Sequence, residues 1–155
     1  MERQYPAGMI PLLTPSSQIL PKGEGIFMYR TLIVEDSNFY RQLLKETLRS
    51  RFPKMEIQEA GDGEEALQKI TGSSPHLIFI DIKLPGESGL ELTRKIKTQY
   101  PTVTIIILTS YDLPEYREAA NQYQANYFLA KGTTTKESIV KLVESIITGW
   151  EKNAS

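Results

Sequence analysis

Residues 77–81 read Leu77-Ile78-Phe79-Ile80-Asp81, an unbroken apolar run that ends in a carboxylate. Continuous apolar runs of this length, bounded by breakers, are typical of strands that are buried on both faces, as in a parallel sheet covered by helices. Three more runs in this 155-residue chain have the same design: Thr31–Val34 before Glu35-Asp36, Val103–Leu108 before Thr109, and Tyr127–Ala130 before Lys131. These runs predict strands of one parallel sheet, each followed at once by a side chain capable of chemistry.

Amphipathic segments alternate with these runs and predict the helices that cover the sheet. The first helix is expected to begin at Ser37, a good N-cap, and to end near Ser50. Its apolar residues are predicted to share one buried face, namely Phe39, Tyr40, Leu43, Leu44 and Leu48. A further strand is expected at 55–60, and the Gly61-Asp62-Gly63 turn after it leads into a short second helix.

The three later helices have sequence signals at their starts. Ser88-Gly89-Leu90-Glu91 is a capping box, Asp112-Leu113-Pro114-Glu115 combines a capping side chain with a proline in the first turn, and Thr134-Thr135-Lys136-Glu137 opens the last helix. Five strand–helix units joined by right-handed crossovers predict an α/β fold, a doubly wound five-stranded parallel sheet. In the flavodoxin-like strand order 2-1-3-4-5, the first and third strands lie side by side.

The side chains at the strand ends are predicted to meet. Ligands of such sheets bind just beyond the carboxyl ends of the strands. The fold would gather five side chains there: Glu35, Asp36, Asp81, Thr109 and Lys131. Three carboxylates, a hydroxyl and an ammonium in one crevice indicate a site for a metal ion beside a phosphoryl group.

Composition excludes several other kinds of site. The formal net charge of −1 gives no sign of the basic surface that nucleic acids and anionic membranes attract. The chain has no cysteine, so disulfides, thiolate metal sites and thiol catalysis are excluded. No apolar stretch approaches the roughly 20 residues that span a bilayer. We therefore expect a soluble, cytoplasmic protein.

The chain is expected to consist of a leader, one domain and a short tail. Residues 1–28 are rich in proline, glycine and serine and are expected to form a flexible leader, followed by a domain at 29–150 and a tail at 151–155. Lys22-Gly23-Glu24-Gly25 requires purine-rich codons and precedes Met28 closely, as a translated ribosome-binding site would. Our hypothesis is that Met28 is the natural start and that the leader arises from a misassigned start codon.

From Arg30 to about Trp150 the chain resembles the receiver domain of bacterial two-component response regulators, the CheY-like family. The resemblance rests on four blocks, which occur in order at the ends of predicted strands. They are Leu32-Ile33-Val34-Glu35-Asp36-Ser37, Asp81-Ile82-Lys83-Leu84-Pro85-Gly86-Glu87-Ser88-Gly89, Leu108-Thr109-Ser110 and Phe128-Leu129-Ala130-Lys131.

The resemblance implies that Asp81 accepts a phosphoryl group from a sensor histidine kinase or a phosphotransfer protein. It also implies a Mg²⁺ site whose ligands are the Glu35, Asp36 and Asp81 carboxylates and the backbone carbonyl of Lys83. The physics agrees, because two unit charges about 4 Å apart repel by roughly 4 kcal/mol at an effective dielectric constant near 20. A divalent cation relieves that repulsion, and an ionised carboxylate such as Asp81 can attack phosphorus to form a labile acyl phosphate.

The family also implies a conformational switch. Thr109 and Lys131 would contact the phosphoryl oxygens, and Thr109 and Phe128 would move together on phosphorylation. Phe128 stands where receivers often carry tyrosine, so packing rather than a hydroxyl would drive the switch. Gly132 stands where the family usually has a proline after a cis peptide bond. A cis bond before a residue other than proline costs about 3 kcal/mol, so we expect a trans bond there.

The output of the domain stays open. One alternative is a stand-alone receiver that contacts a downstream protein, or a second copy of itself, through the last two helices and strand 127–130. The other is a receiver fragment of a DNA-binding transcriptional regulator. In both alternatives, this domain is expected to contact neither nucleic acid nor a membrane directly. It is also expected to catalyse only its own phosphorylation and dephosphorylation. The nearest rival is a pseudo-receiver that is never phosphorylated, which the intact acidic set argues against.

Two further residues lie near the predicted strands without a clear role. The side chain of Lys83 either lies over the site and tunes the phosphoryl lifetime or is simply solvated, and the sequence does not separate these alternatives. His76 is the only histidine. Because it begins the third predicted strand, it is expected at the end of the sheet opposite the site, without a catalytic role.

Overall fold

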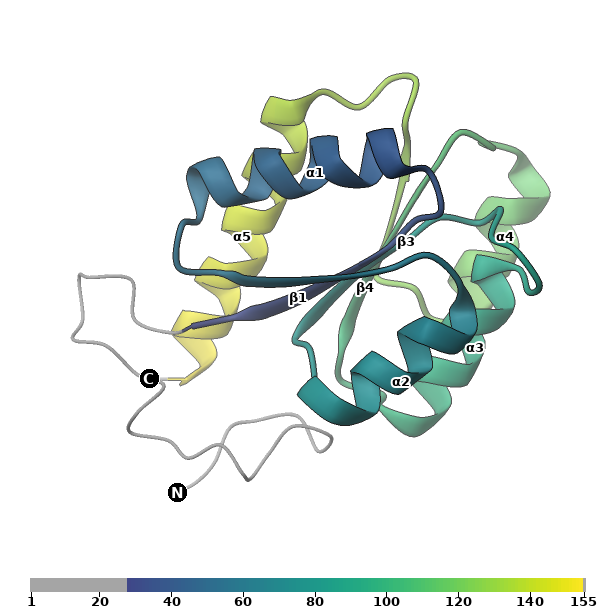
Figure 1. Ribbon diagram of the computed structural model, residues 1–155, viewed down its shortest axis with the longest axis horizontal. Coiled ribbons are helices and arrows are strands. Elements are labelled where there is room, and N and C mark those ends of the chain that lie inside the picture. Colours follow the sequence, from purple (N-terminus) through teal and green to yellow (C-terminus); the bar gives the residue numbers. More distant parts are fainter. Residues whose placement is uncertain (1–27, 155) are drawn as a thin grey trace.

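The computed structural model describes residues 28–154, in which five strands alternate with five helices (Figure 1). The strands are β1 (Arg30–Val34), β2 (Glu56–Ala60), β3 (Leu77–Ile80), β4 (Thr104–Thr109) and β5 (Tyr127–Ala130). The helices are α1 (Asn38–Arg51), α2 (Gly63–Ser73), α3 (Gly89–Gln99), α4 (Pro114–Gln122) and α5 (Lys136–Ala154). Each predicted strand and helix is present, with bounds that differ from the expected ones by a residue or two.

The sheet has the predicted topology. All neighbouring strands are parallel and their order is β2-β1-β3-β4-β5, so the α/β doubly wound fold and the order 2-1-3-4-5 are confirmed. Within residues 28–154, no helix combines the length and the apolarity that crossing a bilayer requires. The leader predicted for residues 1–28 lies, apart from Met28, outside the described residues.

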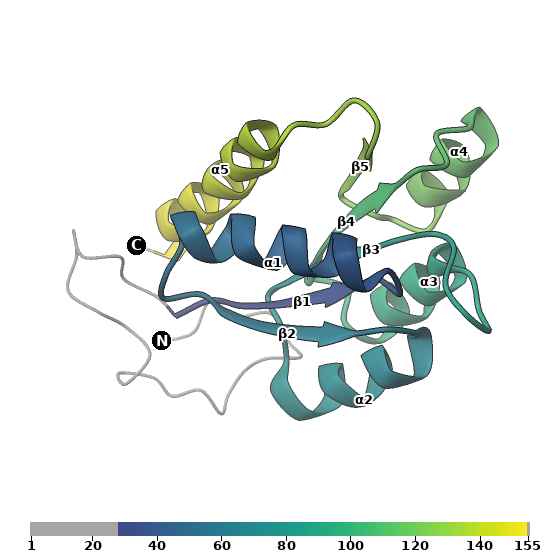
Figure 2. The ribbon, with the colours of Figure 1, turned by 45° about the horizontal axis from the view of Figure 1, so that its top comes forward.

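Helices cover both faces of the sheet and enclose two hydrophobic layers (Figures 1 and 2). Successive strand residues point to opposite faces, so each strand contributes to both layers. In β3, for example, Ile78 and Ile80 pack with α2, α3 and α4, whereas Leu77 and Phe79 pack with α1 and α5. The central strands therefore read as continuous apolar runs because both of their faces are buried.

The start of α1 follows the prediction except at one residue. Ser37 is the N-cap, and its hydroxyl accepts a hydrogen bond from the backbone N–H of Tyr40 at 3.2 Å. Leu44 and Leu48 are buried, but Phe39 is 77% exposed, so the prediction that it shares their buried face is wrong. Phe39 precedes Leu44 by five residues, which places it about 140° around the helix, on the solvent side.

The starts of α3 and α5 follow the prediction, except that no capping bond of Glu91 is seen among the described residues. Ser88 is the N-cap of α3, and its hydroxyl accepts a hydrogen bond from a backbone N–H of the first turn. Glu91, the other predicted member of that capping box, forms an ion pair with Arg94. Before α5, the Thr135 hydroxyl accepts a hydrogen bond from the backbone N–H of Ser138 at 3.0 Å.

The predicted cap of α4 is wrong. Leu113 occupies the N-cap position and makes no side-chain capping hydrogen bond, while Pro114 stands in the first turn as expected. Asp112, the predicted cap, instead forms an ion pair with Arg117 at 2.6 Å. An arginine one turn into the helix is a charged donor that competes for the carboxylate with the backbone N–H groups.

Candidate functional site

The carboxyl ends of four strands meet at one edge of the sheet and carry the predicted site residues. β1 and β3 are neighbours in register, with Val34 beside Ile80, so Glu35 and Asp81 leave adjacent strands at the same level. Across β4 and β5, Thr109 pairs with Ala130, which places Lys131 one residue beyond the pair. Thr109 is the last residue of β4 itself.

The three acidic side chains converge. Glu35, Asp36 and Asp81 each offer a carboxylate oxygen, and these oxygens lie within 4.8 Å of one another. Glu35 is 3% exposed and Asp81 is 7% exposed, whereas Asp36 is exposed to solvent. Oxygen ligands at a site that is open to solvent on one side fit a hard divalent cation. Mg²⁺ is such a cation and usually keeps some of its bound water.

One ammonium lies among these carboxylates. The Nζ of Lys131 donates hydrogen bonds to Glu35 Oε1 at 2.6 Å and to Asp81 Oδ2 at 3.2 Å, and the Lys131 side chain is 14% exposed. Burial by itself lowers the pKa of Lys131, but the hydrogen bond to Glu35 and the two negative charges outweigh it and raise the pKa above its usual value. Lys131 therefore stays charged at neutral pH.

The charge of the cluster is not balanced by that single ammonium. Burial raises the pKa of Glu35, and the nearby Asp81 charge adds to this effect, although hydrogen bonds from Lys131 and from the Ser37 backbone oppose it. Three carboxylates with one ammonium hold excess negative charge at a largely buried point. A bound cation would offset that excess charge.

The backbone around Asp81 is held tightly. Asp81 Oδ1 accepts a hydrogen bond from the backbone N–H of Ile82 at 2.7 Å, and the Asp81 N–H donates to the Val34 carbonyl at 3.0 Å. The first residue of α3, Gly89, lies so close that a Cβ atom there would stand 1.9 Å from the Asp81 carbonyl oxygen. Gly89 belongs to the predicted helix start and to one of the four blocks quoted above; the signal for this close approach is a glycine at a helix position where a side chain would ordinarily be favoured.

Thr109 and Phe128 lie on the same side of the sheet. Thr109 is fully buried, and its Oγ1 accepts a hydrogen bond from the backbone N–H of Tyr111 at 3.3 Å. Phe128 pairs with Ile107, two residues before Thr109, and packs against the layer beneath α3 and α4. The guanidinium carbon of Arg117, on α4, lies 4.6 Å from the centre of the Phe128 ring. The two predicted switch residues thus lie on adjacent strands and on the same side of the sheet.

The side chain of Lys83 points toward aromatic rings. Its Nζ lies 5.0 Å from the ring centre of Tyr111 and 5.8 Å from that of Tyr116. Lys83 is exposed, as the solvated alternative expects, and its ammonium reaches from the loop after β3 to the segment that starts α4. The peptide bond between Lys131 and Gly132 is trans, as expected, because the described residues include no cis peptide bond.

His76 serves packing at the start of β3. Its Nδ1 accepts a hydrogen bond from the Arg30 backbone N–H at 3.0 Å, and its ring contacts those of Tyr29 and Trp150. Burial lowers the pKa of His76 to about 3, so the imidazole is neutral at physiological pH. The residue lies where the sequence placed it, at the opposite end of β3 from Asp81.

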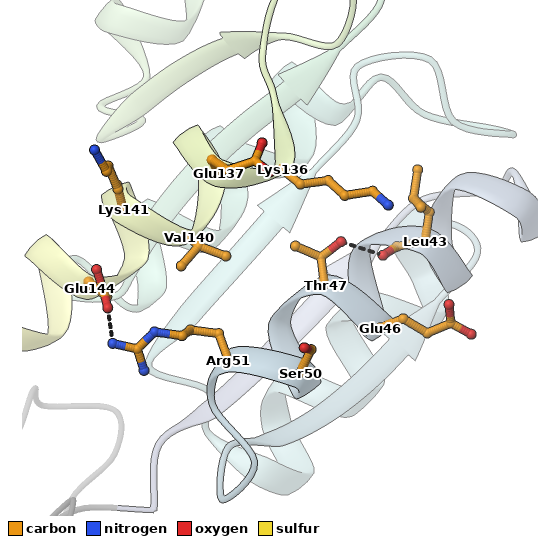
Figure 3. Close-up of a pocket in the computed structure, with 10 residues that line it drawn as sticks. All are labelled: Leu43, Glu46, Thr47, Ser50, Arg51, Lys136, Glu137, Val140, Lys141 and Glu144. Atoms are coloured by element: carbon orange, nitrogen blue, oxygen red, sulfur yellow. Dashed lines mark hydrogen bonds and ion pairs between the residues drawn. The ribbon is translucent and has the colours of Figure 1, made fainter.

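A separate groove of about 480 Å³ runs between α1 and α5 (Figure 3). Lysine, arginine and glutamate side chains line it together with Leu43 and Val140, and an ion pair between Arg51 and Glu144 spans one end. None of the five residues predicted for the site lines this groove. The groove is therefore distinct from the site that holds the three carboxylates and Lys131.

The chain is similar to known proteins. The model of the response regulator receiver domain family matches residues 31–144. YesN of Bacillus subtilis, described as an uncharacterized transcriptional regulatory protein, is 35% identical over 91 residues, and the match covers 59% of this chain and 24% of YesN. The chain thus spans about a quarter of the length of that relative.

Solved structures share the fold. A CheY-like response regulator receiver domain protein from Methanospirillum hungatei aligns with a TM-score of 0.75 and 26% identity, covering 82% of this chain and 99% of that one. The Mn²⁺-bound form of the response regulator Rcp1 aligns with a TM-score of 0.66 and 25% identity, covering 79% of this chain and 94% of that one.

Proposed function

This chain belongs to the response regulator receiver domain family, and from that premise we propose that Asp81 is its phosphoacceptor, receiving a phosphoryl group from a histidine kinase or a phosphotransfer protein in the cytoplasm. The observation that carries the proposal is the meeting of three carboxylates and the Lys131 ammonium at one edge of the sheet. Phosphoryl transfer depends on positioning and charge neutralisation more than on covalent help from the protein, and this edge supplies both.

In the proposed reaction an oxygen of Asp81 attacks the phosphorus of a phosphohistidine. An O–P bond forms, giving an acyl phosphate on Asp81, and the N–P bond breaks. The imidazole leaves with the electron pair of that bond. Lys131 balances charge on the phosphoryl oxygens, since its Nζ already lies 3.2 Å from Asp81 Oδ2, and the Thr109 hydroxyl donates a hydrogen bond to one of them.

We propose that Mg²⁺ is the cofactor, with the Glu35, Asp36 and Asp81 carboxylates and the Lys83 backbone carbonyl as its protein ligands. The donor set supports this choice, because all of the proposed ligand atoms are oxygens and three of them belong to carboxylates. Mg²⁺ prefers oxygen ligands of this kind. Rcp1, a relative in fold, has a Mn²⁺-bound structure, which supports a divalent cation as the cofactor here. When bound, the ion would neutralise charge on the transferring phosphoryl oxygens.

We further propose that the acyl phosphate stabilises a second arrangement of Thr109 and Phe128, which carries the signal to the surface formed by α4, β5 and α5. Exposed apolar side chains in this region, including Tyr127 at 40%, support a protein partner or a second copy of this chain there. A ligand shifts such an equilibrium only through its different affinity for the two states, and phosphoryl contacts to Thr109 would provide that difference.

The test is treatment with acetyl phosphate and Mg²⁺, followed by intact-mass measurement. We expect one added phosphoryl group in the wild-type protein and none in Asp81→Asn, whose amide is not a nucleophile. Addition that persists in Asp81→Asn would move the acceptor elsewhere. No addition in the wild-type protein, with or without Mg²⁺, would favour a pseudo-receiver that acts without phosphorylation.

One similarity favours the second of the two alternatives for the downstream function of this domain. The similarity to YesN, a transcriptional regulatory protein in description, supports a receiver that regulates transcription rather than a stand-alone receiver. In both cases the phosphorylated domain acts through protein contacts, and we propose no reaction other than its own phosphorylation and dephosphorylation. Size-exclusion chromatography with and without acetyl phosphate tests for a phosphorylation-dependent self-dimer.

A further inference from the structure

Lys131 has a third contact besides the two carboxylates. Its Nζ lies over the ring of Tyr40, 4.1 Å from the ring centre. A cation this close to the face of an aromatic ring is attracted by the negative potential of the ring. The ammonium therefore contacts Glu35, Asp81 and the Tyr40 ring at once.

Helix geometry and packing fix the position of the Tyr40 ring. Tyr40 lies in the first turn of α1, where its backbone N–H donates to the N-cap hydroxyl of Ser37, and its half-buried ring packs against the layer that contains Leu44 and Phe79. The free space enclosed between Tyr40, Glu35 and Asp81 is only about 10 Å³. That volume holds one water molecule at most, so little water separates the ring from the carboxylates.

The Tyr40 ring is also neutral. Burial raises the pKa of Tyr40, with smaller contributions from the neighbouring charges, so the phenol keeps its proton at neutral pH. The ring therefore attracts Lys131 through its π-face without adding another negative charge to the cluster.

We propose that Tyr40 is a positioning residue for phosphorylation: its ring keeps the Lys131 ammonium directed at Asp81. This inference rests on the proposed function. The carboxylates that hold Lys131 are also the proposed metal ligands, and their attraction for the ammonium weakens when a divalent cation shares their charge. The ring is no ligand for such a cation, so its attraction for Lys131 persists throughout the reaction.

Two substitutions separate the ring from its hydroxyl and from its volume. Tyr40→Phe keeps the π-face, while Tyr40→Leu keeps an apolar side chain in the layer but removes the π-face. With acetyl phosphate and Mg²⁺, we expect the phosphorylation rate of Tyr40→Phe to stay within about twofold of wild type and that of Tyr40→Leu to fall about fivefold. Thermal unfolding shows whether each variant is folded at the assay temperature.

A spectroscopic readout tests the contact without any phosphorylation. In nuclear magnetic resonance spectra, the methylene protons next to Lys131 Nζ should lie at higher field than those of other lysines, because they stand over an aromatic face. This displacement should remain in Tyr40→Phe and disappear in Tyr40→Leu. The Lys131→Ala variant identifies the resonance.

The outcomes are distinguishable. If wild-type Lys131 shows no displaced resonance, the contact is absent in solution and the inference is wrong, whatever Tyr40→Leu does. Equal rates for Tyr40→Leu and wild type, or equal losses for Tyr40→Phe and Tyr40→Leu, would also overturn it. If the wild-type protein takes up no phosphoryl group, the proposed function fails, and the role of Tyr40 in phosphorylation fails with it even where the resonance is displaced.

Discussion

Replacing Gly89 by alanine should damage both the stability and the reactivity of this domain. A Cβ at this first residue of α3 would lie 1.9 Å from the carbonyl oxygen of Asp81, 2.8 Å from its carbonyl carbon and 2.8 Å from Cγ2 of Ile80. Ordinary contact begins near 3.4 Å, so α3 and the end of β3 would have to separate by about 1.5 Å. The obstacle is mainly backbone, which cannot swing aside as the tip of a side chain does.

The expected magnitude is the difference between two opposing effects. Alanine inside a helix is usually favoured over glycine by roughly 0.5–1 kcal/mol. Forcing extra volume into a packed site destabilises by about 1–3 kcal/mol, and a clash with backbone belongs at the upper end of that range. We therefore expect Gly89→Ala to lower the free energy of unfolding by about 2 kcal/mol.

The same displacement should slow phosphorylation, because it moves the backbone that carries the nucleophile. A misplacement of about 1 Å in a reacting group can reduce a rate by roughly a hundredfold. Urea unfolding measures the stability change, and intact mass after timed exposure to acetyl phosphate and Mg²⁺ measures the rate under conditions where the variant is folded.

A matched control lies in α5. Gly149 is also helical, but a Cβ there would meet nothing within 4 Å, so Gly149→Ala should stabilise the protein by roughly 0.5–1 kcal/mol and leave the rate unchanged. If Gly89→Ala behaves like Gly149→Ala in both assays, the close approach of α3 to Asp81 does not matter and the reasoning is refuted.

Two further predictions concern buried polar groups away from the site. The pKa of His76 is about 3 in the folded protein and 6.5 in a free side chain, so below pH 6.5 the unfolded chain binds a proton that the folded protein excludes. The free energy of unfolding should therefore fall by about 2 kcal/mol between pH 7 and pH 5 from this group alone. His76→Asn keeps an acceptor for the Arg30 N–H but does not titrate, so its urea-unfolding free energy should fall less over that range, and an equal fall in both proteins would contradict the assignment. Lys97 Nζ donates to the carbonyls of Pro101 and Val103, so Lys97→Met should lower the unfolding free energy by about 1–3 kcal/mol, whereas an unchanged urea midpoint would show that water replaces the ammonium.

Much of the fold follows from short stretches of the chain. A run such as 77–80 carries its own strand signal, and the alternation of such runs with amphipathic segments leaves few topologies once the crossovers are right-handed. The errors occur where several neighbours compete. Asp112 has the right chemistry for a cap, but Arg117 binds it instead, and Phe39 belongs to the apolar pattern while facing solvent.

The grouping of Glu35, Asp81 and Lys131 was predictable for a simple reason. Each follows a strand directly, and parallel strands end at a common edge, so connectivity alone brings the three side chains together. Which oxygen accepts from which nitrogen was not predictable, because hydrogen bonds depend on ångström-scale positions that the pattern of residue types does not contain.

The order of residues was therefore sufficient for the sheet, for the two layers of helices and for the edge that carries the acidic cluster, since these depend on local periodicity and on chain connectivity. The contacts of Tyr40 with Lys131, of Lys83 with two tyrosine rings and of Gly89 with the Asp81 backbone emerged only once the elements were packed. The apolar periodicity of a helix is compatible with many rotations of the helix about its axis and many positions along the sheet. Only the packing of the whole domain selects one of them, and it thereby selects which side chains surround the reactive carboxylate.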